Sequence, residues 1–441
     1  MADEVSVKLR DVCVKIGSGA TPRGGKEAYK GGATSLIRSQ NIYNDGFHRD
    51  GLVYIDDAQS AELRNVEVKL DDVLLNITGD SVARCCQVAA DVLPARVNQH
   101  VAIIRPQQKS LDARFLRYVL VSHEYQSRLL ALASAGATRS ALTKSMIEEL
   151  DIPSPPLAEQ KTIAAVLGAL DDKIELNRRM NATLESMARA LFQSWFVDFD
   201  PVRAKLDGRK PVGLDSATEA LFPATFQDSP IGHIPSGWEA AELGQIADVI
   251  DCLHAKKPER CETGQLYLQL NNIRDDGLID ITDSFFVSAE DYKKWISRME
   301  AVAGDCVITN VGRVGAVGQI PEGVKAALGR YITGIRCKAE FPFHTFLIEC
   351  LVSESMRDEI RLKTDSGTIL DALNVKSIPK LRLARPTREI GARFETLTRP
   401  LRRRMEQNIS ESRTLAAMRD TLLPKLLSGE LSVNSKVDNG N

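Results

Sequence analysis

Apolar residues between positions 157 and 196 recur at alternating steps of four and three, which is the spacing of one stripe along an α-helix. A stripe this narrow is typical of a coiled-coil seam, where a helix packs against a partner helix. Asn177 and Asn181 take two positions of the stripe, and a buried asparagine in a seam lowers stability but fixes the register. The apolar positions are Ile163, Leu167, Leu170, Ile174, Leu184, Ala188, Leu191 and Trp195.

The same phase returns near the C-terminus, displaced by 231 positions (408 − 177 = 231). Asn408 takes the place of Asn177, which favours two long helices that pack on each other with these asparagines setting the register; two unrelated amphipathic helices are the alternative. Pro400 and Pro424 fall inside the second pattern, so the second helix is expected to begin or kink at Pro400 and to bend before Leu426. The second stripe consists of Phe394, Thr398, Leu401, Met405, Asn408, Ser412, Leu415, Leu422 and Leu426.

The segments that precede the two helices also repeat at this offset. Gln40-Asn41 matches Asn271-Asn272, and Ile104-Arg105 matches Ile335-Arg336. Short apolar runs broken by Gly, Asn and Asp, with one helix of about twenty residues near the end, predict an α+β fold in which two strand-rich α/β globules repeat in tandem. The expected parts are a first globule (1–155), a first long helix (156–200), a connector (201–236), a second globule (237–386), a second long helix (387–430) and a disordered tail (431–441).

Composition narrows the class of protein. The chain has 441 residues and a net charge of −2, so binding to nucleic acid would depend on local basic patches or on a partner. Its eight cysteines are scattered without a CxxC pair, which predicts reduced thiols and a cytoplasmic location without disulfides or zinc. The sequence also lacks a run of about 18 apolar residues that would predict a membrane span.

Motifs for catalysis are weak. The sequence has no GxxxxGK[ST] loop for a nucleotide phosphate, and its six histidines show no metal-ligand spacing. Ser154-Pro155-Pro156-Leu157 compares with the [DNS]PP-aromatic loop of amino-methyltransferases, but Leu157 replaces the aromatic residue that stacks on a flipped base. Glu67-Val68-Lys69 suits a nuclease only superficially, because the repeat has Glu300-Ala301-Val302 there. We therefore expect no catalytic residue, metal or cofactor on this chain.

Polar loops remain as candidates for contact with DNA. Arg and Lys pair with guanine edges, Asn and Gln pair with adenine edges, and glycine admits a phosphate close to the backbone. The matched pairs at 40–41 and 271–272 carry most weight, although asparagines at such places also cap turns after strands. Arg399 and Arg402 to Arg404 would form a basic face or a solvated face of the second helix. The candidate DNA-binding residues are Gly19, Thr21, Arg23, Lys26, Arg38, Gln40, Asn41, Tyr43, Asn44, Thr138, Arg139, Lys256, Lys257, Gln269, Asn271, Asn272, Arg274, Asn310, Arg313, Arg330 and Tyr331.

Four stretches together resemble the specificity subunit of type I restriction–modification systems, over essentially the whole chain. They are Gly19-Ala20-Thr21-Pro22, the segment IPSPPLAEQK (152–161), the segment FQSWFVDFDP (192–201) and Ile234-Pro235-Ser236-Gly237-Trp238. The second copy departs from this pattern, because RPTRE (385–389) stands where the first copy has PPLAEQ.

The resemblance implies that the globules are target recognition domains, each reading one half of a bipartite, asymmetric site in double-stranded DNA. It implies that the helices form an antiparallel coiled coil that spaces them. It further implies two methylation subunits, which use S-adenosylmethionine to methylate adenine, and restriction subunits in the full complex. This chain would then be a non-catalytic subunit, and a scaffold that reads no sequence or a complete fused enzyme are the alternatives.

Overall fold

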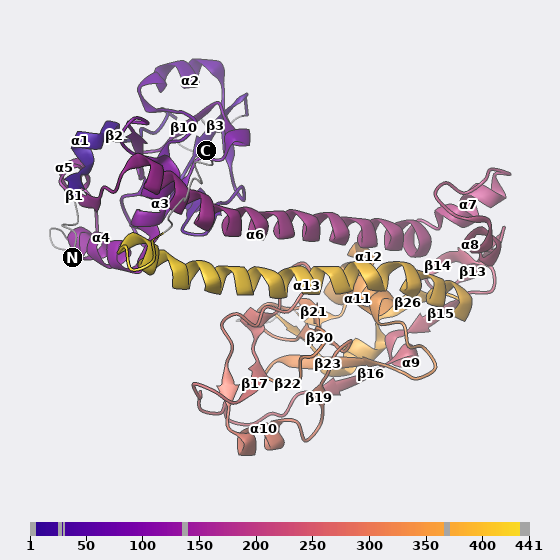
Figure 1. Ribbon diagram of the computed structural model, residues 1–441. Helices are drawn as coiled ribbons and strands as arrows, with labels where there is room; N and C mark the ends of the chain where they lie inside the picture. Colours follow the sequence, from indigo (N-terminus) through magenta and orange to yellow (C-terminus); the bar gives the residue numbers. More distant parts are fainter. Residues whose placement is uncertain (1–5, 25–28, 30, 135–139, 366–370, 433–441) are drawn as a thin grey trace, which may run out of the picture. The chain divides into compact units, whose positions relative to one another are not determined.

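The structure, a computed structural model, describes residues 6–24, 29, 31–134, 140–365 and 371–432. It divides into two compact units, each built from a globule and one part of each long helix (Figure 1). The long helices are α6 (Leu157–Phe192) and α13 (Arg388–Leu427). Unit 1 takes the described residues up to Ile174 and those from Thr414 onward, and unit 2 takes residues 175–413. Unit 1 is therefore assembled from both ends of the chain.

Two four-stranded sheets form the globule of unit 1. One has the order β2-β11-β8-β9 with antiparallel neighbours, and the other has the order β6-β3-β10-β7, in which β3 and β10 are parallel. The central β8 is buried at every residue, as expected for a short apolar run covered on both faces. The strands are β2 (Cys13–Ser18), β3 (Thr34–Ile37), β6 (Val53–Ile55), β7 (Glu67–Val68), β8 (Val73–Asn76), β9 (Cys85–Gln87), β10 (Ala95–Val97) and β11 (Val101–Pro106).

Short helices and strand pairs complete unit 1. Strand β1 pairs with β12, and β4 pairs with β5. These elements are β1 (Ser6–Lys8), α1 (Leu9–Val12), β4 (Ile42–Tyr43), β5 (Gly46–Phe47), α2 (Asp57–Glu62), α3 (Ala113–Val121), α4 (His123–Ser134), α5 (Lys144–Glu148) and β12 (Asp151–Pro153).

Unit 2 repeats this topology. Its sheets have the orders β16-β23-β20-β21 and β18-β17-β22-β19, and β17 and β22 are parallel as β3 and β10 are in unit 1. The predicted tandem repeat is therefore present in the strand order itself. The strands are β16 (Ala247–Asp251), β17 (Gln265–Leu268), β18 (Phe286–Val287), β19 (Glu300–Ala301), β20 (Cys306–Thr309), β21 (Val317–Gln319), β22 (Ala326–Leu328) and β23 (Ile332–Cys337).

The remaining elements of unit 2 include those formed by the segment expected as a connector. The π-helical turn Gln193–Val197 follows α6, and strand pairs β13–β14, β15–β26 and β24–β25 lie along the chain after it. These elements are α7 (Asp200–Leu206), α8 (Ser216–Leu221), β13 (Phe226–Ser229), β14 (Gly232–Pro235), β15 (Glu239–Glu242), α9 (Leu243–Ile246), α10 (Ala289–Trp295), α11 (His344–Val352), α12 (Glu354–Leu362), β24 (Thr364–Asp365), β25 (Ala372–Leu373) and β26 (Arg382–Arg385).

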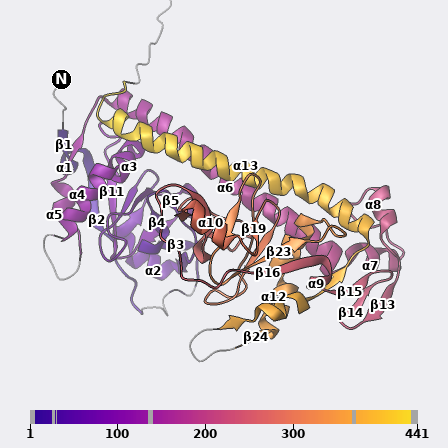
Figure 2. The ribbon, with the colours of Figure 1, turned by 90° about the horizontal axis from the view of Figure 1, so that it is seen from below.

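The two long helices lie side by side and antiparallel, as expected (Figure 2). Within unit 2, the Asn177 Nδ2 donates to Glu411 Oε2 at 2.8 Å, while Asn181 Nδ2 donates to Met405 O at 3.2 Å. Rising numbers on α6 thus meet falling numbers on α13. Asn408 Nδ2 donates to Asn181 Oδ1 at 2.8 Å, and Asn177 and Asn408 are both fully buried. Both asparagines are placed as a register-setting role requires, and that role stays a prediction.

Of the two alternatives for Pro400, a helix start there is wrong, and the expected second helix (387–430) is present almost in full. Helix α13 starts at Arg388 and continues through both prolines to Leu427. Each proline removes the hydrogen bond to the carbonyl four residues earlier, which belongs to Thr396 for Pro400. Thr396 and Pro400 are both exposed, so water can hydrate the carbonyl group of Thr396. Exposure satisfies the released carbonyl group, and packing of the buried stripe of α13 offsets the remaining cost of about 3 kcal/mol for an interior proline.

The segment FQSWFVDFDP supplies the aromatic core of unit 2. The Phe196 ring lies 4.9 Å from that of Phe346, 5.0 Å from that of Phe394 and 5.7 Å from that of Trp238, measured between ring centroids. Trp195 beside it is 1% exposed. Edge-to-face packing of this kind stabilises the junction between α6, α11 and α13 beyond the area that it buries.

Gln160, in the segment IPSPPLAEQK, fastens the start of α6 in unit 1. Its Oε1 accepts from Asp112 N at 2.9 Å, and its Nε2 donates to Pro155 O at 2.9 Å and Ser110 O at 3.1 Å. The second copy has Gly391 at this position (391 − 160 = 231), and Phe343 packs against it where Asp112 stands in unit 1. Packing of the Phe343 ring against Gly391 thus takes the place of the Gln160 hydrogen bonds, which accounts for the absence of this glutamine in the second copy.

Candidate nucleic-acid interface

The matched asparagines Asn41 and Asn272 close the same turn in the two units. Asn41 Nδ2 donates to His48 O at 3.0 Å and Asp50 O at 3.1 Å, while its Oδ1 accepts from Arg38 N at 3.1 Å. Asn272 Nδ2 donates to Asp280 O at 2.8 Å, and its Oδ1 accepts from Gln269 N at 2.8 Å. Both side chains are buried, so the turn-capping alternative describes them and neither faces a ligand.

The residues beside these caps are the ones that reach the surface. Gln40 and Asn271 are exposed at the equivalent step of each turn. Arg38 is half-buried and donates to Gly51 O at 2.6 Å, and Gln40 Nε2 lies 3.3 Å from the same oxygen. Gln269, the counterpart of Arg38, accepts from Lys257 Nζ at 2.6 Å. The buried asparagine therefore presents a polar neighbour outward in each unit.

A second exposed turn joins β10 to β11 in unit 1 and β22 to β23 in unit 2. Its residues are Gln99 and His100 in the first copy and Arg330 and Tyr331 in the second. Sequence reasoning found only the second pair, although the 231 offset would have pointed to the first. His100 Nδ1 lies 2.6 Å from Thr78 Oγ1, and the Arg330 guanidinium lies 5.2 Å from the Tyr331 ring centroid. Tyr331 has a φ of 67°, a left-handed conformation unusual for a residue with a side chain.

The loop after β2 reaches the same end of unit 1. Gly19 N donates to Val101 O at 2.8 Å, and a Cβ on Gly19 would lie 2.1 Å from Val97 O, so only glycine fits this approach. Thr21 hydrogen-bonds to Gln99, and Arg23 is exposed beyond it. The predicted contacts Lys26, Thr138 and Arg139 lie outside the described residues.

Tyr43 and Asn44 differ in how accessible their side chains are to a ligand. Half-buried Tyr43 stacks on His48 with ring centroids 4.1 Å apart, and the Arg84 guanidinium lies 4.6 Å from its ring centroid. Asn44 is held in the globule, because its Nδ2 donates to Gln126 Oε1 at 3.1 Å and its Oδ1 accepts from the backbone at 2.9 Å. The structure therefore uses Asn44 to join a turn to α4.

The remaining candidate DNA-binding residues of unit 2 are two lysines, one buried asparagine and two arginines. Lys257 lies with its Nζ 4.4 Å from the Phe285 ring centroid, and Lys256 beside it is exposed. Asn310 is buried and donates from Nδ2 to Thr333 Oγ1 at 2.8 Å, which makes it a structural residue. The two arginines form ion pairs within the unit. Arg274 pairs with Asp276 Oδ2 at 2.6 Å, and Arg313 pairs with Asp275.

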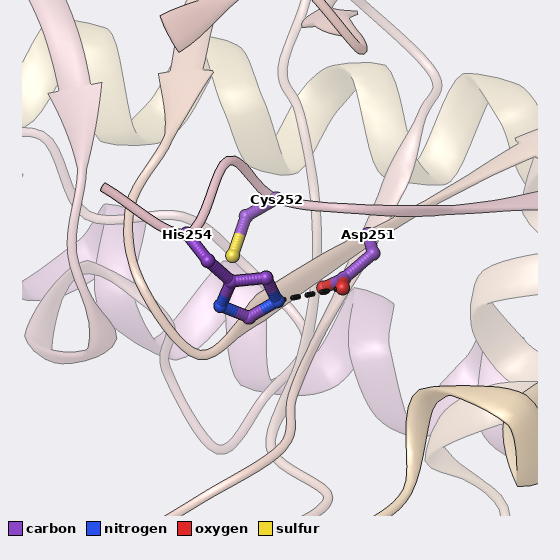
Figure 3. Close-up of side chains that lie close together, drawn as sticks. All are labelled: Asp251, Cys252 and His254. Atoms are coloured by element: carbon purple, nitrogen blue, oxygen red, sulfur yellow. Dashed lines mark hydrogen bonds and ion pairs between the residues drawn. The ribbon is translucent and has the colours of Figure 1, made fainter.

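Three potential metal ligands meet at the end of β16, where Figure 3 shows the His254 ring turned toward Asp251 with the Cys252 sulfur beside them. Their donor atoms all lie within 4.8 Å of one another. His254 Nε2 is 2.7 Å from Asp251 Oδ2, and Arg298 Nη1 is 3.6 Å from the same oxygen. Burial raises the pKa of the Cys252 thiol, which disfavours the thiolate that binds metals. These contacts describe a polar anchor for the loop that carries Lys256 and Lys257.

The basic face expected on the second helix is interrupted. Arg402 is buried and donates to Gly277 O, while Arg403 faces outward and pairs with Glu322 at 3.2 Å. Among the described helices, none is both long enough and apolar enough to cross a membrane.

Comparison with known proteins identifies relatives of this arrangement. Residues 1–186 match the family model for the type I restriction modification DNA specificity domain. The type I restriction enzyme HindI specificity subunit of Haemophilus influenzae is 26% identical over 408 residues, covering 82% of this chain and 87% of that protein. The MjaIX specificity subunit of Methanocaldococcus jannaschii is 26% identical over 440 residues, covering 97% and 93%.

A solved structure has the same fold. The crystal structure of a type I restriction-modification system S subunit from M. genitalium superposes with a TM-score of 0.57 at 17% identity, covering 96% of this chain and 95% of that one. The resemblance to type I specificity subunits expected from the sequence is therefore confirmed.

Proposed function

We propose that this chain, a relative of the type I specificity subunits, recognises DNA sequence for a type I restriction–modification complex, each unit reading one half of a bipartite, asymmetric site. One observation carries the proposal. The two units share one strand order but expose different side chains at equivalent turns, with Gln40 against Asn271 and Gln99 against Arg330. Two domains that recognise different half-sites require a common scaffold with different exposed polar side chains.

The exposed residues suit base and phosphate contacts. Gln and Asn present a donor and an acceptor together, as an adenine edge requires, and Arg330 suits the two acceptors of guanine. Tyr331 adds an aromatic face that is 37% exposed. Glycine at position 19 allows the loop to approach the strands closely and leaves its polar neighbours free for phosphate oxygens.

In this proposal the paired helices set the distance between half-sites and dock two methylation subunits. A rigid spacer raises the effective concentration of the second half-site contact, but only at the correct DNA separation. The methylation subunits bind S-adenosylmethionine and take the target adenine out of the duplex, so this chain supplies the address and no catalytic group. Restriction subunits join through the methylation subunits, and no metal or cofactor belongs to this chain.

A domain exchange tests the proposal. Residues 1–155 are replaced by the corresponding segment of another specificity subunit, and methylated adenines are mapped in genomic DNA from cells that also express the methylation subunits. One half-site should change while the other half-site stays the same. If the methylated sequence does not move, the chain is a scaffold that reads no sequence. The purified chain alone with S-adenosylmethionine and DNA should transfer no methyl group, and transfer would identify a fused enzyme.

A further inference from the structure

A cavity of about 310 Å³ in unit 2 is lined by four arginines from three separate stretches of chain. Arg274 follows the capped turn after β17, Arg313 stands on the turn between β20 and β21, and Arg357 and Arg361 are on α12. Asp275 is the one carboxylate residue in its described lining, and the inner wall includes apolar residues such as Ile360. The cavity therefore concentrates guanidinium groups at an open surface.

The arginines differ in how fully they are paired. Arg274 pairs with Asp276 Oδ2 at 2.6 Å, Arg361 pairs with Asp358 Oδ1 at 2.7 Å, and Arg313 pairs with Asp275. Arg357 is exposed and forms no ion pair with a carboxylate among the described residues. The Arg361–Asp358 and Arg313–Asp275 pairs are solvent-exposed, whereas Asp276 is partly buried beneath Arg274. An exposed ion pair contributes little, so a stronger anion can displace those two pairs at small cost.

Unit 1 lacks these four arginines at the equivalent positions, although the Arg84 guanidinium lies 4.6 Å from the ring centroid of Tyr43. At the positions 231 residues earlier, Tyr43 stands for Arg274, Gln126 for Arg357 and Leu130 for Arg361. Asp80 takes the turn position of Arg313, since each follows a glycine with a φ near 80° (77° for Gly79 and 82° for Gly312). Gln126 in unit 1 instead donates a hydrogen bond to Ala83 O at 2.9 Å. The arginines are thus an addition to the common scaffold.

We propose that this cavity binds a phosphate group of the DNA backbone, so that unit 2 holds its half-site by a phosphate clamp that unit 1 lacks. The inference rests on the proposed function. Guanidinium groups bind phosphate oxygens in pairs of parallel hydrogen bonds, and several around one cavity give the strongest arrangement. The volume equals that of about ten water molecules, enough for a phosphodiester with part of its hydration.

Residues that line the cavity are linked through the backbone to the turns that carry the candidate base contacts. Arg274 is two residues after the buried cap Asn272 and three after exposed Asn271. Arg313 donates to Ile273 O, in the same turn, and the strand that precedes it leads to Asn310, whose N donates to Tyr331 O at 2.8 Å. A phosphate in the cavity would therefore fix the register of the DNA against Asn271 and Tyr331.

The test measures the salt dependence of DNA binding by the full chain in complex with its methylation subunits. The double variant R357Q/R361Q should lower the magnitude of the slope of log K against log salt by about 1, and weaken cognate and non-cognate DNA alike. The matched control K293Q/K294Q on α10 removes the same charge from exposed residues outside the cavity lining and should keep the slope. D275N removes the one carboxylate of the described lining. In contrast to the arginine variant, it should raise the affinity for DNA severalfold.

The outcomes separate the clamp from the recognition function. If the wild-type complex selects its site while R357Q/R361Q keeps the wild-type slope and D275N changes nothing, the clamp is wrong and recognition stands. If the wild-type complex selects no DNA, both proposals fail. Should R357Q/R361Q not fold, D275N decides alone, because its side chain is 94% exposed and its replacement leaves the core intact.

Discussion

Gln40 in unit 1 and Asn271 in unit 2 stand at the same step of the same turn, each directly before a buried asparagine that closes that turn. Neighbouring residues of one polar pair therefore have different tasks. The inner residue builds the turn, and the outer residue is available to a ligand.

Replacing the inner residue should affect stability. N41A and N272A each remove buried hydrogen bonds and leave backbone groups without partners, so we expect a loss of about 1–3 kcal/mol in the free energy of unfolding. Q40A and N271A should leave stability within about 0.5 kcal/mol but alter the methylated sequence at particular bases. Thermal unfolding and methylation mapping of the four variants measure this. A changed sequence preference in N41A at unchanged stability would contradict the division of tasks.

Gln160 should matter more than its neighbours on α6. Q160A removes three hydrogen bonds at a side chain that is 1% exposed, and we expect unit 1 to lose about 2–4 kcal/mol. The adjacent K161A is the control, because Lys161 is exposed. Limited proteolysis of the region 1–174 reports the opening of this unit. Equal protection in Q160A and K161A would show that the hydrogen bonds contribute nothing.

The asparagines between the helices should limit stability. Among the described residues, Asn177 Oδ1 and Asn408 Oδ1 are buried without a hydrogen-bond partner. The double variant N177L/N408L should therefore raise the free energy of unfolding by about 1 kcal/mol or more. The variant should also relax the permitted gap between half-sites, since register is no longer fixed by a polar pair. Urea unfolding and methylation mapping test both parts. A more stable variant that keeps one gap would show that register is set elsewhere.

A heptad insertion tests the spacing. Because α6 pairs with α13, seven residues must enter both helices at matched levels to keep the asparagine contacts. Such an insertion adds about 10 Å to each helix and should move the permitted half-site gap by about three base pairs. The same insertion in α6 alone should lower stability because it breaks the pairing. An unchanged gap in the matched variant would refute the role of the helices as a spacer.

Glu349 should make unit 2 sensitive to pH. Burial raises the pKa of its carboxyl to about 7 from an ordinary 4.5, although Arg402 and Arg189 act in the other direction. Its stabilising contribution is therefore complete below about pH 4.5 and is lost as the pH rises through about 7. E349Q should be more stable than the wild type at pH 8, by up to about 3 kcal/mol, and similar at pH 4.5. Tryptophan fluorescence reports unit 2 alone, because Trp195, Trp238 and Trp295 all lie in it.

Periodicity could predict the helices and the repeat because each depends on spacing alone. The stripe from Ile163 and its copy from Phe394 follow from one helical phase, and the strand orders repeat with them. Spacing places Pro400 outside the apolar stripe, but it does not show whether the packing of that stripe is strong enough to continue the helix through a proline. An interior proline costs a helix about 3 kcal/mol, so the packing of the buried stripe of α13 has to offset it.

The candidate site was predicted at the level of turns but not of single side chains. Whether Asn41 or Gln40 faces outward depends on the backbone groups of His48 and Asp50, which the sequence does not place. Gln99 and His100 lie in a three-residue turn between apolar strands that has no motif of its own, and only the offset of 231 from Arg330 and Tyr331 points to them. The cavity of unit 2 joins residues 274, 313 and 357, which come together only through the strand order.

The assembly of unit 1 from both ends of the chain has a consequence for synthesis on the ribosome. Leu423 and Leu426 of α13 share a buried cluster with Ile163 and Leu167 of α6. These last leucines emerge after the whole of unit 2, so the first globule to be translated is the last to be covered. Until then Ile163 and Leu167 lack these partners, so removal of the end of α13 is expected to destabilise the N-terminal unit.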